Sequence, residues 1–126
     1  MRTQPQKLSL AELYAAAQTL TPGSDDFNEV FEVAVRMFPN DANANLNAAN
    51  AAMSTGNLKA AERYLEKAGD SEEAEYARGV LAARMDDFDT ATTHFGKASS
   101  IPQAKDAIDT IERIKAGKDK VRIKLQ

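Results

Sequence analysis

The sequence has no cysteine and no tryptophan, and it holds only 6 glycines and 4 prolines in 126 residues. Without cysteine, disulfides, thiolate metal sites and cysteine nucleophiles are excluded. No run of about 18 apolar residues occurs, so the sequence predicts no membrane span. Met1–Lys7 lacks the apolar stretch of a secretory signal, and we expect residues 1–7 to be a disordered edge cut from a longer chain. The alanine-rich remainder favours packed helices over sheet.

Charge is distributed unevenly along the chain. Residues 1–112 contain 10 Lys and Arg against 18 Asp and Glu, whereas residues 113–126 contain 6 basic residues and one acidic residue. The acidic body argues against nucleic acid as a ligand. The basic tail, 117–126, alternates apolar and basic residues in a strand-like pattern. Three interpretations stay open for it: a disordered terminus, a strand that pairs with another domain or chain, or a contact with an anionic surface.

Two segments that lie thirty residues apart share one pattern: a turn residue is followed by alternating large and small apolar residues. The first consists of Gly56, Leu58, Ala61, Leu65 and Ala68, and the second of Asp86, Phe88, Ala91, Phe95 and Ala98. At the same offset, Ala49 and Ala52 are matched by Gly79 and Ala82. An internal repeat of helical pairs favours a binding scaffold over an enzyme.

Helical periodicity and capping residues predict seven helices. They cover about 10–20, 25–38, 42–54, 58–68, 72–85, 88–99 and 102–116. Ser9 and Glu12 form a capping box at the first start, and Gly117 is expected to end the last helix. Because the loops are short, consecutive helices must be antiparallel neighbours. The prediction is an all-α fold.

These residues resemble the tetratricopeptide repeat (TPR) family, whose helix pairs need small residues where helices cross and larger ones in the next layer. The small positions are Ala34, Ala49, Ala61, Ala68, Gly79, Ala91 and Ala98, and the large ones are Phe31, Leu65 and Phe95. The resemblance implies an α-α superhelix of about three TPR-like hairpins, with units at about 8–41, 42–71 and 72–102 and a capping helix at 102–116. The TPR-like domain would thus cover 8–116.

A narrower likeness concerns the N-terminal third of the chain. The run from Leu8 to Tyr14, the junction Pro39-Asn40-Asp41 and the segment from Ala44 to Ala49 are similar to the C-terminal TPR region of larger, fimbria-associated bacterial cell-envelope proteins. This likeness implies a periplasmic or outer-membrane setting and no known reaction. It also implies that other domains of a parent chain are among the partners.

Four asparagines within eight residues, Asn43 to Asn50, stand out because asparagine is a poor helix former. In TPR units the first helix of each pair lines a concave groove, and an amide can both donate to and accept from an extended peptide backbone. The groove residues implied by the resemblance are Glu12, Asn43, Leu46, Asn47, Asn50, Met53, Glu73, Tyr76, Val80 and Arg84. Alternatively, the asparagines are solvated or capping residues, with Asn45 facing away from the groove.

The charge of this face bears on its ligand. Glu12, Glu73 and Ala77 stand where other family members place cations, so we expect neutral or mildly basic extended segments rather than a carboxylate terminus. Tyr76 is the best anchor, since it has an aromatic body and a polar tip. Its alternative role is ordinary packing between helices.

Catalysis finds little support in the sequence. His94 is the only histidine, and no cysteine or second histidine accompanies it in a metal site or a nucleophile triad. The acidic pairs fall at helix starts, where they compensate the helix dipole. The sequence therefore predicts a non-catalytic protein-interaction module without cofactor or metal, whose partner is a protein or peptide. The alternative is a structural spacer or a self-association domain.

Overall fold

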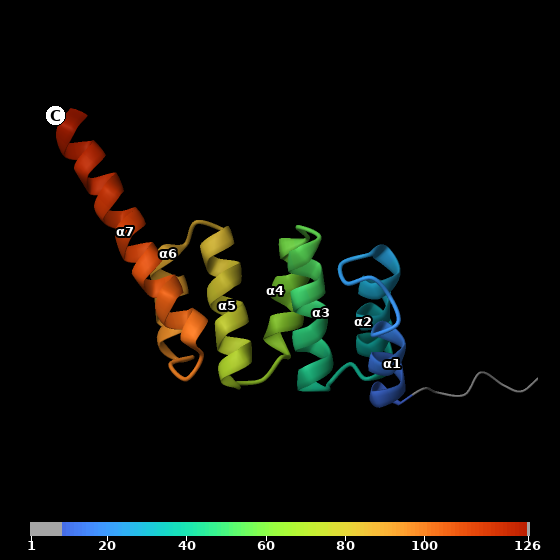
Figure 1. Cartoon of the computed structure of the whole chain (residues 1–126). Helices are drawn as coiled ribbons and strands as arrows, with labels where there is room; N and C mark the ends of the chain where they lie inside the picture. The colour runs from blue at the N-terminus through green and yellow to red at the C-terminus, as the bar shows by residue number, and fades with distance from the viewer. Residues whose placement is uncertain (1–8, 126) are drawn as a thin grey trace, which may run out of the picture. The chain divides into compact units, whose positions relative to one another are not determined.

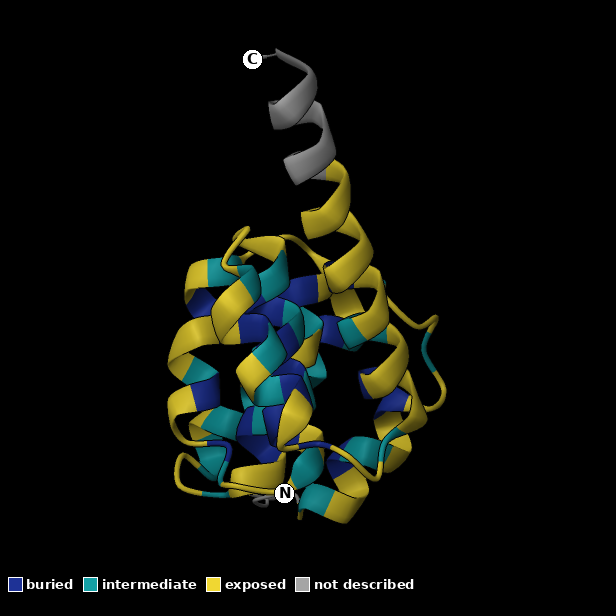
Figure 2. Cartoon of the chain, turned by 90° about the vertical axis from the view of Figure 1, so that its left-hand side faces the viewer, coloured by how far each residue is buried: buried dark blue, intermediate teal, exposed yellow. Residues whose placement is uncertain are grey.

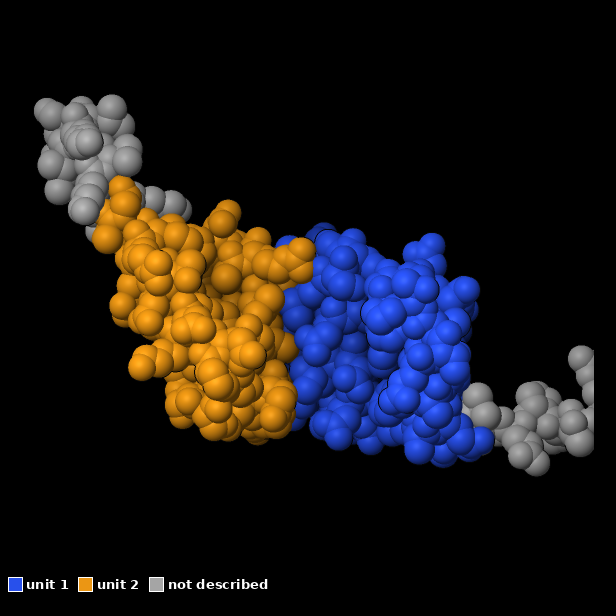
Figure 3. All heavy atoms as spheres, in the orientation of Figure 1, with its two compact units in different colours: residues 1–69 blue, residues 70–126 orange. Residues whose placement is uncertain are grey.

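A computed structural model describes the backbone of residues 9–125 and the side chains of residues 9–117. Over these residues the chain forms seven α-helices and no strand (Figure 1). The predicted all-α fold of helical hairpins is confirmed. The disordered edge expected at residues 1–7 lies outside the described residues. The chain divides into two compact units, unit 1 (Met1–Gly69) and unit 2 (Asp70–Gln126), which Figure 3 shows in blue and orange.

Unit 1 contains two hairpins, formed by α1 (Leu10–Ala17) with α2 (Asp25–Met37) and by α3 (Ala42–Ser54) with α4 (Leu58–Glu66). A side-chain oxygen caps each helix start by accepting a hydrogen bond from the backbone N–H three residues later. The caps are Ser9, Ser24, Asp41 and Asn57. Such caps satisfy donors that the helix itself leaves open. Consecutive helices pack against each other throughout the unit.

The core of unit 1 is made largely of small side chains. Leu13, Ala34 and Ala44 are buried at its centre, with half-buried Val and aromatic residues around them. Phe31 meets Phe27 edge-on at a ring distance of 5.0 Å and lies 6.0 Å from Tyr14. Because alanine has so short a side chain, the helix backbones can approach closely, and the aromatic rings fill the wider gap between α1 and α2.

Unit 2 contains the hairpin of α5 (Glu72–Arg84) and α6 (Phe88–Gly96), followed by α7 (Pro102–Leu125). Its core contains Phe95 and Ile111 among buried alanines. Gly79 is essential to this packing, because a Cβ placed there would lie 2.6 Å from the Phe95 ring. An ion pair of 2.5 Å between Lys115 Nζ and Asp89 Oδ1 links α7 to α6.

Two features of α7 correct the sequence analysis. The helix continues through Gly117 to Leu125, so Gly117 does not end it, and of the three interpretations of the tail the strand is wrong. A helix closes its backbone hydrogen bonds within the segment, whereas a strand needs a partner edge; lysine and arginine are also good helix formers. Residues 112–117 of α7 are exposed, beyond the part that packs on the core, and Figure 2 shows an exposed (yellow) stretch of this helix.

The other helices begin where the sequence predicts, but α1, α4 and α6 end two or three residues early. At the end of α4, the N–H groups of Lys67 and Ala68 bond to the carbonyls of Tyr64 and Leu65, three residues back. Such tightened last turns are common at helix ends.

Candidate functional site

The predicted groove residues of α3 form one continuous stripe on its open side. Asn43 and Asn50 are exposed, and Leu46 and Asn47 are half-buried between them. The opposite side of the helix, with Ala44, Ala48 and Ala49, is buried. Positions three and four apart share a helix face, so Asn43, Leu46, Asn47 and Asn50 offer three amides to one neighbouring segment. We call these four residues the α3 face.

Two further residues of α3 are part of the packing. Met53 is only 5% exposed and belongs to the core, so it offers no accessible surface to a partner. Asn45, which was expected to face away from the groove, is buried at 1% exposure. Its Nδ2 donates to the carbonyl oxygens of Pro39 at 3.1 Å and Asp41 at 2.9 Å. Asn45 therefore holds the α2–α3 junction against the start of α3.

Glu12 on α1 has a structural partner. Its Oε1 accepts from the Ser9 N–H at 3.1 Å, and the Ser9 hydroxyl accepts from the Glu12 N–H at 3.1 Å. The hydrogen bond from the Ser9 backbone, and next that with its side chain, lowers the pKa of Glu12. The capping box expected from the sequence is confirmed, and it accounts for this carboxylate without a ligand.

On α5 the predicted site residues divide between surface and core. Glu73 and Arg84 are exposed, whereas Tyr76 and Val80 are half-buried and pack against the core of unit 2. The Tyr76 ring lies 5.4 Å from the Phe95 ring, tilted by 53°. This is the interhelical packing that the sequence analysis named as the alternative role of Tyr76.

A charged cluster on α5 and α6 was missed by the sequence analysis. Glu75 is 9% exposed, and its carboxylate meets His94 Nδ1 at 2.7 Å and Arg78 Nη1 at 3.0 Å. Burial raises the pKa of Glu75, but the His94 hydrogen bond and the charges of Arg78, His94 and Lys97 outweigh it, so the pKa is lowered overall. The cluster joins the two helices and explains why the single histidine lies on this side of α6.

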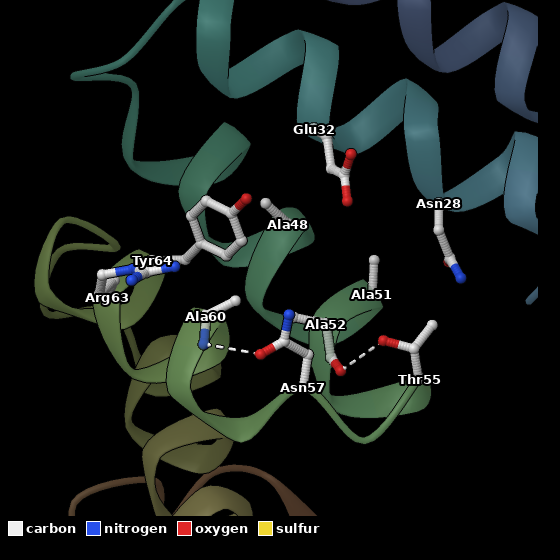
Figure 4. A pocket seen from close by; sticks show the side chains of 10 residues that line it. All are labelled: Asn28, Glu32, Ala48, Ala51, Ala52, Thr55, Asn57, Ala60, Arg63 and Tyr64. Atoms are coloured by element: carbon white, nitrogen blue, oxygen red, sulfur yellow. Dashed lines mark hydrogen bonds between the residues drawn. The ribbon is translucent and has the colours of Figure 1, made fainter.

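A pocket of about 270 Å³ opens between α2, α3 and α4 of unit 1. Its floor is alanine, and its walls carry polar groups and one aromatic ring (Figure 4). The lining consists of Asn28, Glu32, Ala48, Ala51, Ala52, Thr55, Asn57, Ala60, Arg63 and Tyr64. Its α3 residues are distinct from the α3 face. The sequence analysis did not predict this pocket. In the sequence its floor appears only as alanines at 48, 51 and 52, and alanines at such positions are typical of ordinary helix packing.

Comparison with known proteins agrees with this geometry. Residues 28–84 match a family model described as tetratricopeptide repeat, a segment that includes all of α3, α4 and α5. The match supports a TPR family, and TPR repeats suggest a protein-interaction module; the family is generally non-catalytic. No curated protein matches the chain. Over the residues that the structure describes, none of the helices has the length and hydrophobicity needed to cross a bilayer.

Proposed function

We propose that this chain is a non-catalytic interaction module that binds an extended segment of a protein partner. The observation that carries the proposal is the α3 face, a stripe of three amides and one leucine that the packing of unit 1 leaves open. Asparagine amides donate and accept hydrogen bonds, as an extended backbone requires, and they do so without demanding a particular side-chain sequence. The TPR match supports a protein as the partner class.

The exposed acidic residues of α1 and α5 favour a partner segment that is not negatively charged. Glu12 and Glu73 carry negative charge on the first helices of their hairpins, and both are exposed. A partner segment that is neutral or mildly basic avoids repulsion from these carboxylates. We propose further that the chain is part of a larger bacterial envelope protein, a setting that rests on the likeness of residues 8–49 alone.

The test compares capture of partners by the parent chain and by a variant of the α3 face. Asn43→Asp, Asn47→Asp and Asn50→Asp together remove three amide donors while keeping side-chain size. A matched control makes three amide-to-acid changes at other exposed positions, Gln18→Glu, Asn40→Asp and Gln103→Glu. Both variants must retain the helical circular dichroism of the parent.

The proposal predicts a partner that the parent and the control capture from an envelope extract and the α3-face variant does not. Capture by all three proteins would contradict it, and so would capture by none. A parent that captures nothing and shows a concentration-dependent mass in sedimentation would support self-association instead.

A further inference from the structure

The pocket between α2, α3 and α4 presents hydrogen-bond acceptors on its α2 side. Figure 4 shows the Glu32 carboxylate directed over Ala48 and Ala51, and Asn28 on the same helix. Asn28 is 8% exposed, and its Oδ1 is buried without a hydrogen-bond partner, while its Nδ2 reaches the Gly23 carbonyl only at 3.5 Å. A buried acceptor without a donor is costly, so the α2 side of the pocket carries unmet hydrogen-bonding capacity.

The opposite wall supplies an aromatic ring. Tyr64 from α4 lies beside Ala48, with its hydroxyl end toward Ala48, and lines the same pocket as Glu32 (Figure 4). A tyrosine ring and a carboxylate that line one small pocket suit a planar cation, which can contact the ring and donate hydrogen bonds at the same time. The volume of about 270 Å³ is below that of pockets for drug-sized molecules and suits a single side chain.

The second hairpin has an arginine at the position equivalent to one of the pocket-lining alanines. At the thirty-residue offset, Arg78 stands in place of Ala48, His94 in place of Tyr64 and Glu75 in place of Asn45. In the second hairpin the Arg78 guanidinium pairs with the Glu75 carboxylate at 3.0 Å. In the first hairpin Ala48 ends at its Cβ and lines the pocket, and the carboxylate that lines the pocket is that of Glu32 on α2.

We propose that this pocket binds an arginine side chain of a protein partner, with the guanidinium between Glu32 and Tyr64. Guanidinium is favoured over ammonium because it is planar, offers five donors and loses less hydration on burial. Arg63 also lines the pocket, and its positive charge opposes such a ligand. The site is distinct from the α3 face and does not depend on it.

The experiment is a titration of the full chain, followed by amide NMR shifts, with N-acetylarginine methylamide. The corresponding citrulline compound is an uncharged probe of nearly the same shape, and the lysine compound carries its charge on an ammonium. The expected result is saturable shifts at Ala48, Ala51 and Tyr64 with the arginine probe, weaker binding of the lysine probe, and no saturation with citrulline. Equal binding of arginine and citrulline, or of arginine and lysine, would overturn the proposal, as would the absence of saturable shifts.

Three variants sharpen the test. Glu32→Gln should weaken arginine binding about tenfold, since it removes a charge-assisted contact. Arg63→Gln should strengthen it, because it removes a like charge. Glu29→Gln, an exposed acid on α2 outside the pocket, is the matched control and should change nothing.

A filling variant tests the location of the bound probe. Ala51→Leu adds volume at a half-buried lining position, so it should abolish binding while the helical signal remains. Unchanged binding to Ala51→Leu or to Glu32→Gln would place the probe elsewhere and overturn the assignment.

Discussion

The hairpins α3–α4 and α5–α6 share one backbone frame and differ in what fills it. Both turns close with a hydrogen bond of 2.9 Å, from the Asn57 N–H to the Ala52 carbonyl and from the Asp87 N–H to the Ala82 carbonyl. Asn57 and Asp87 then cap the second helix in the same way. A single frame therefore accepts two different sets of side chains between its helices.

Two apolar core positions differ together between the two hairpins. Where the first hairpin has buried Ala49 and Leu65, the second has Gly79 and Phe95 at the same offset, with the Phe95 ring against Gly79. The larger ring requires the loss of the methyl group, since packed interiors leave no room for both. The thirty-residue repeat thus preserves total volume more closely than residue identity.

The buried polar side chains of the two hairpins differ in size and in the groups that they bind. The first hairpin uses buried Asn45 to bind backbone carbonyls, and it leaves a pocket beside Ala48. The second uses Glu75 to bind Arg78 and His94 on its own helices. The second hairpin pairs its buried carboxylate within its own helices, while the first leaves a pocket beside Ala48 whose carboxylate, Glu32, lies on α2.

The largest expected effect comes from Gly79→Ala, which places a methyl group against the Phe95 ring. We expect a loss of about 2–3 kcal/mol in the free energy of unfolding, because overpacking outweighs the better helix propensity of alanine. Urea denaturation measures the change. The double variant Gly79→Ala/Phe95→Leu reproduces the pair of the first hairpin and should recover most of the loss. Additive losses in the double variant would show that the two hairpins do not exchange this pair.

A smaller effect is expected for Asn45→Ala. The change leaves the Pro39 and Asp41 carbonyls without their side-chain donor and should cost about 1–2 kcal/mol. Asn43→Ala, an exposed asparagine of the same helix, is the control and should change the free energy of unfolding by less than about 0.5 kcal/mol. Equal effects of the two variants in thermal denaturation would contradict the structural role of Asn45.

Acid should weaken the cluster of the second hairpin. Because folding lowers the pKa of Glu75 below its ordinary value of 4.5, its contribution is present above that value and is lost as the pH falls through the folded pKa. We expect Glu75→Gln to cost about 1 kcal/mol at neutral pH and progressively less as the pH falls below 4.5 through the folded pKa. Urea denaturation across this pH range measures the change, with Glu73→Gln as the exposed control. A deficit independent of pH would contradict the role of the carboxylate charge.

The smallest effect concerns the turns. Gly56 has φ +82°, and its counterpart Asp86 has φ +61°, the left-handed region that favours glycine. Asp86→Gly should therefore stabilise the chain by about 0.5–1 kcal/mol, and Gly56→Ala should destabilise it by a similar amount. Opposite shifts in the midpoint of thermal denaturation are expected. A loss of stability in both variants would show that Asp86 makes a contribution beyond its backbone conformation.

Local signals in the sequence predicted most of the fold. Caps such as Ser9 and Asp41 act on N–H groups three residues away, so helix starts could be placed from sequence alone. The end of α7 was wrong because a glycine can remain helical and because the alternation after it resembles a strand only if a partner edge exists.

The site was harder to predict because its residues depend on contacts between helices. Asn43 and Asn50 are exposed, whereas Met53 is buried and Tyr76 packs against the core, although all four were predicted to line the groove. The hydrogen bond between Glu75 and His94 joins residues that are nineteen positions apart in the sequence, and no local sequence pattern predicts it. Only the offset of thirty, which aligns His94 with Tyr64, relates this cluster to the first hairpin.

The most direct test of the account is photo-cross-linking from the α3 face in cells that produce the chain naturally. A benzoylphenylalanine is placed at Asn50 or, as a control, at exposed Lys59 on α4. The account predicts a cross-link from position 50 to one contiguous segment of a protein partner, and none to that segment from position 59. Cross-links to the same segment from both positions, or only between copies of this chain, would contradict partner binding through the α3 face.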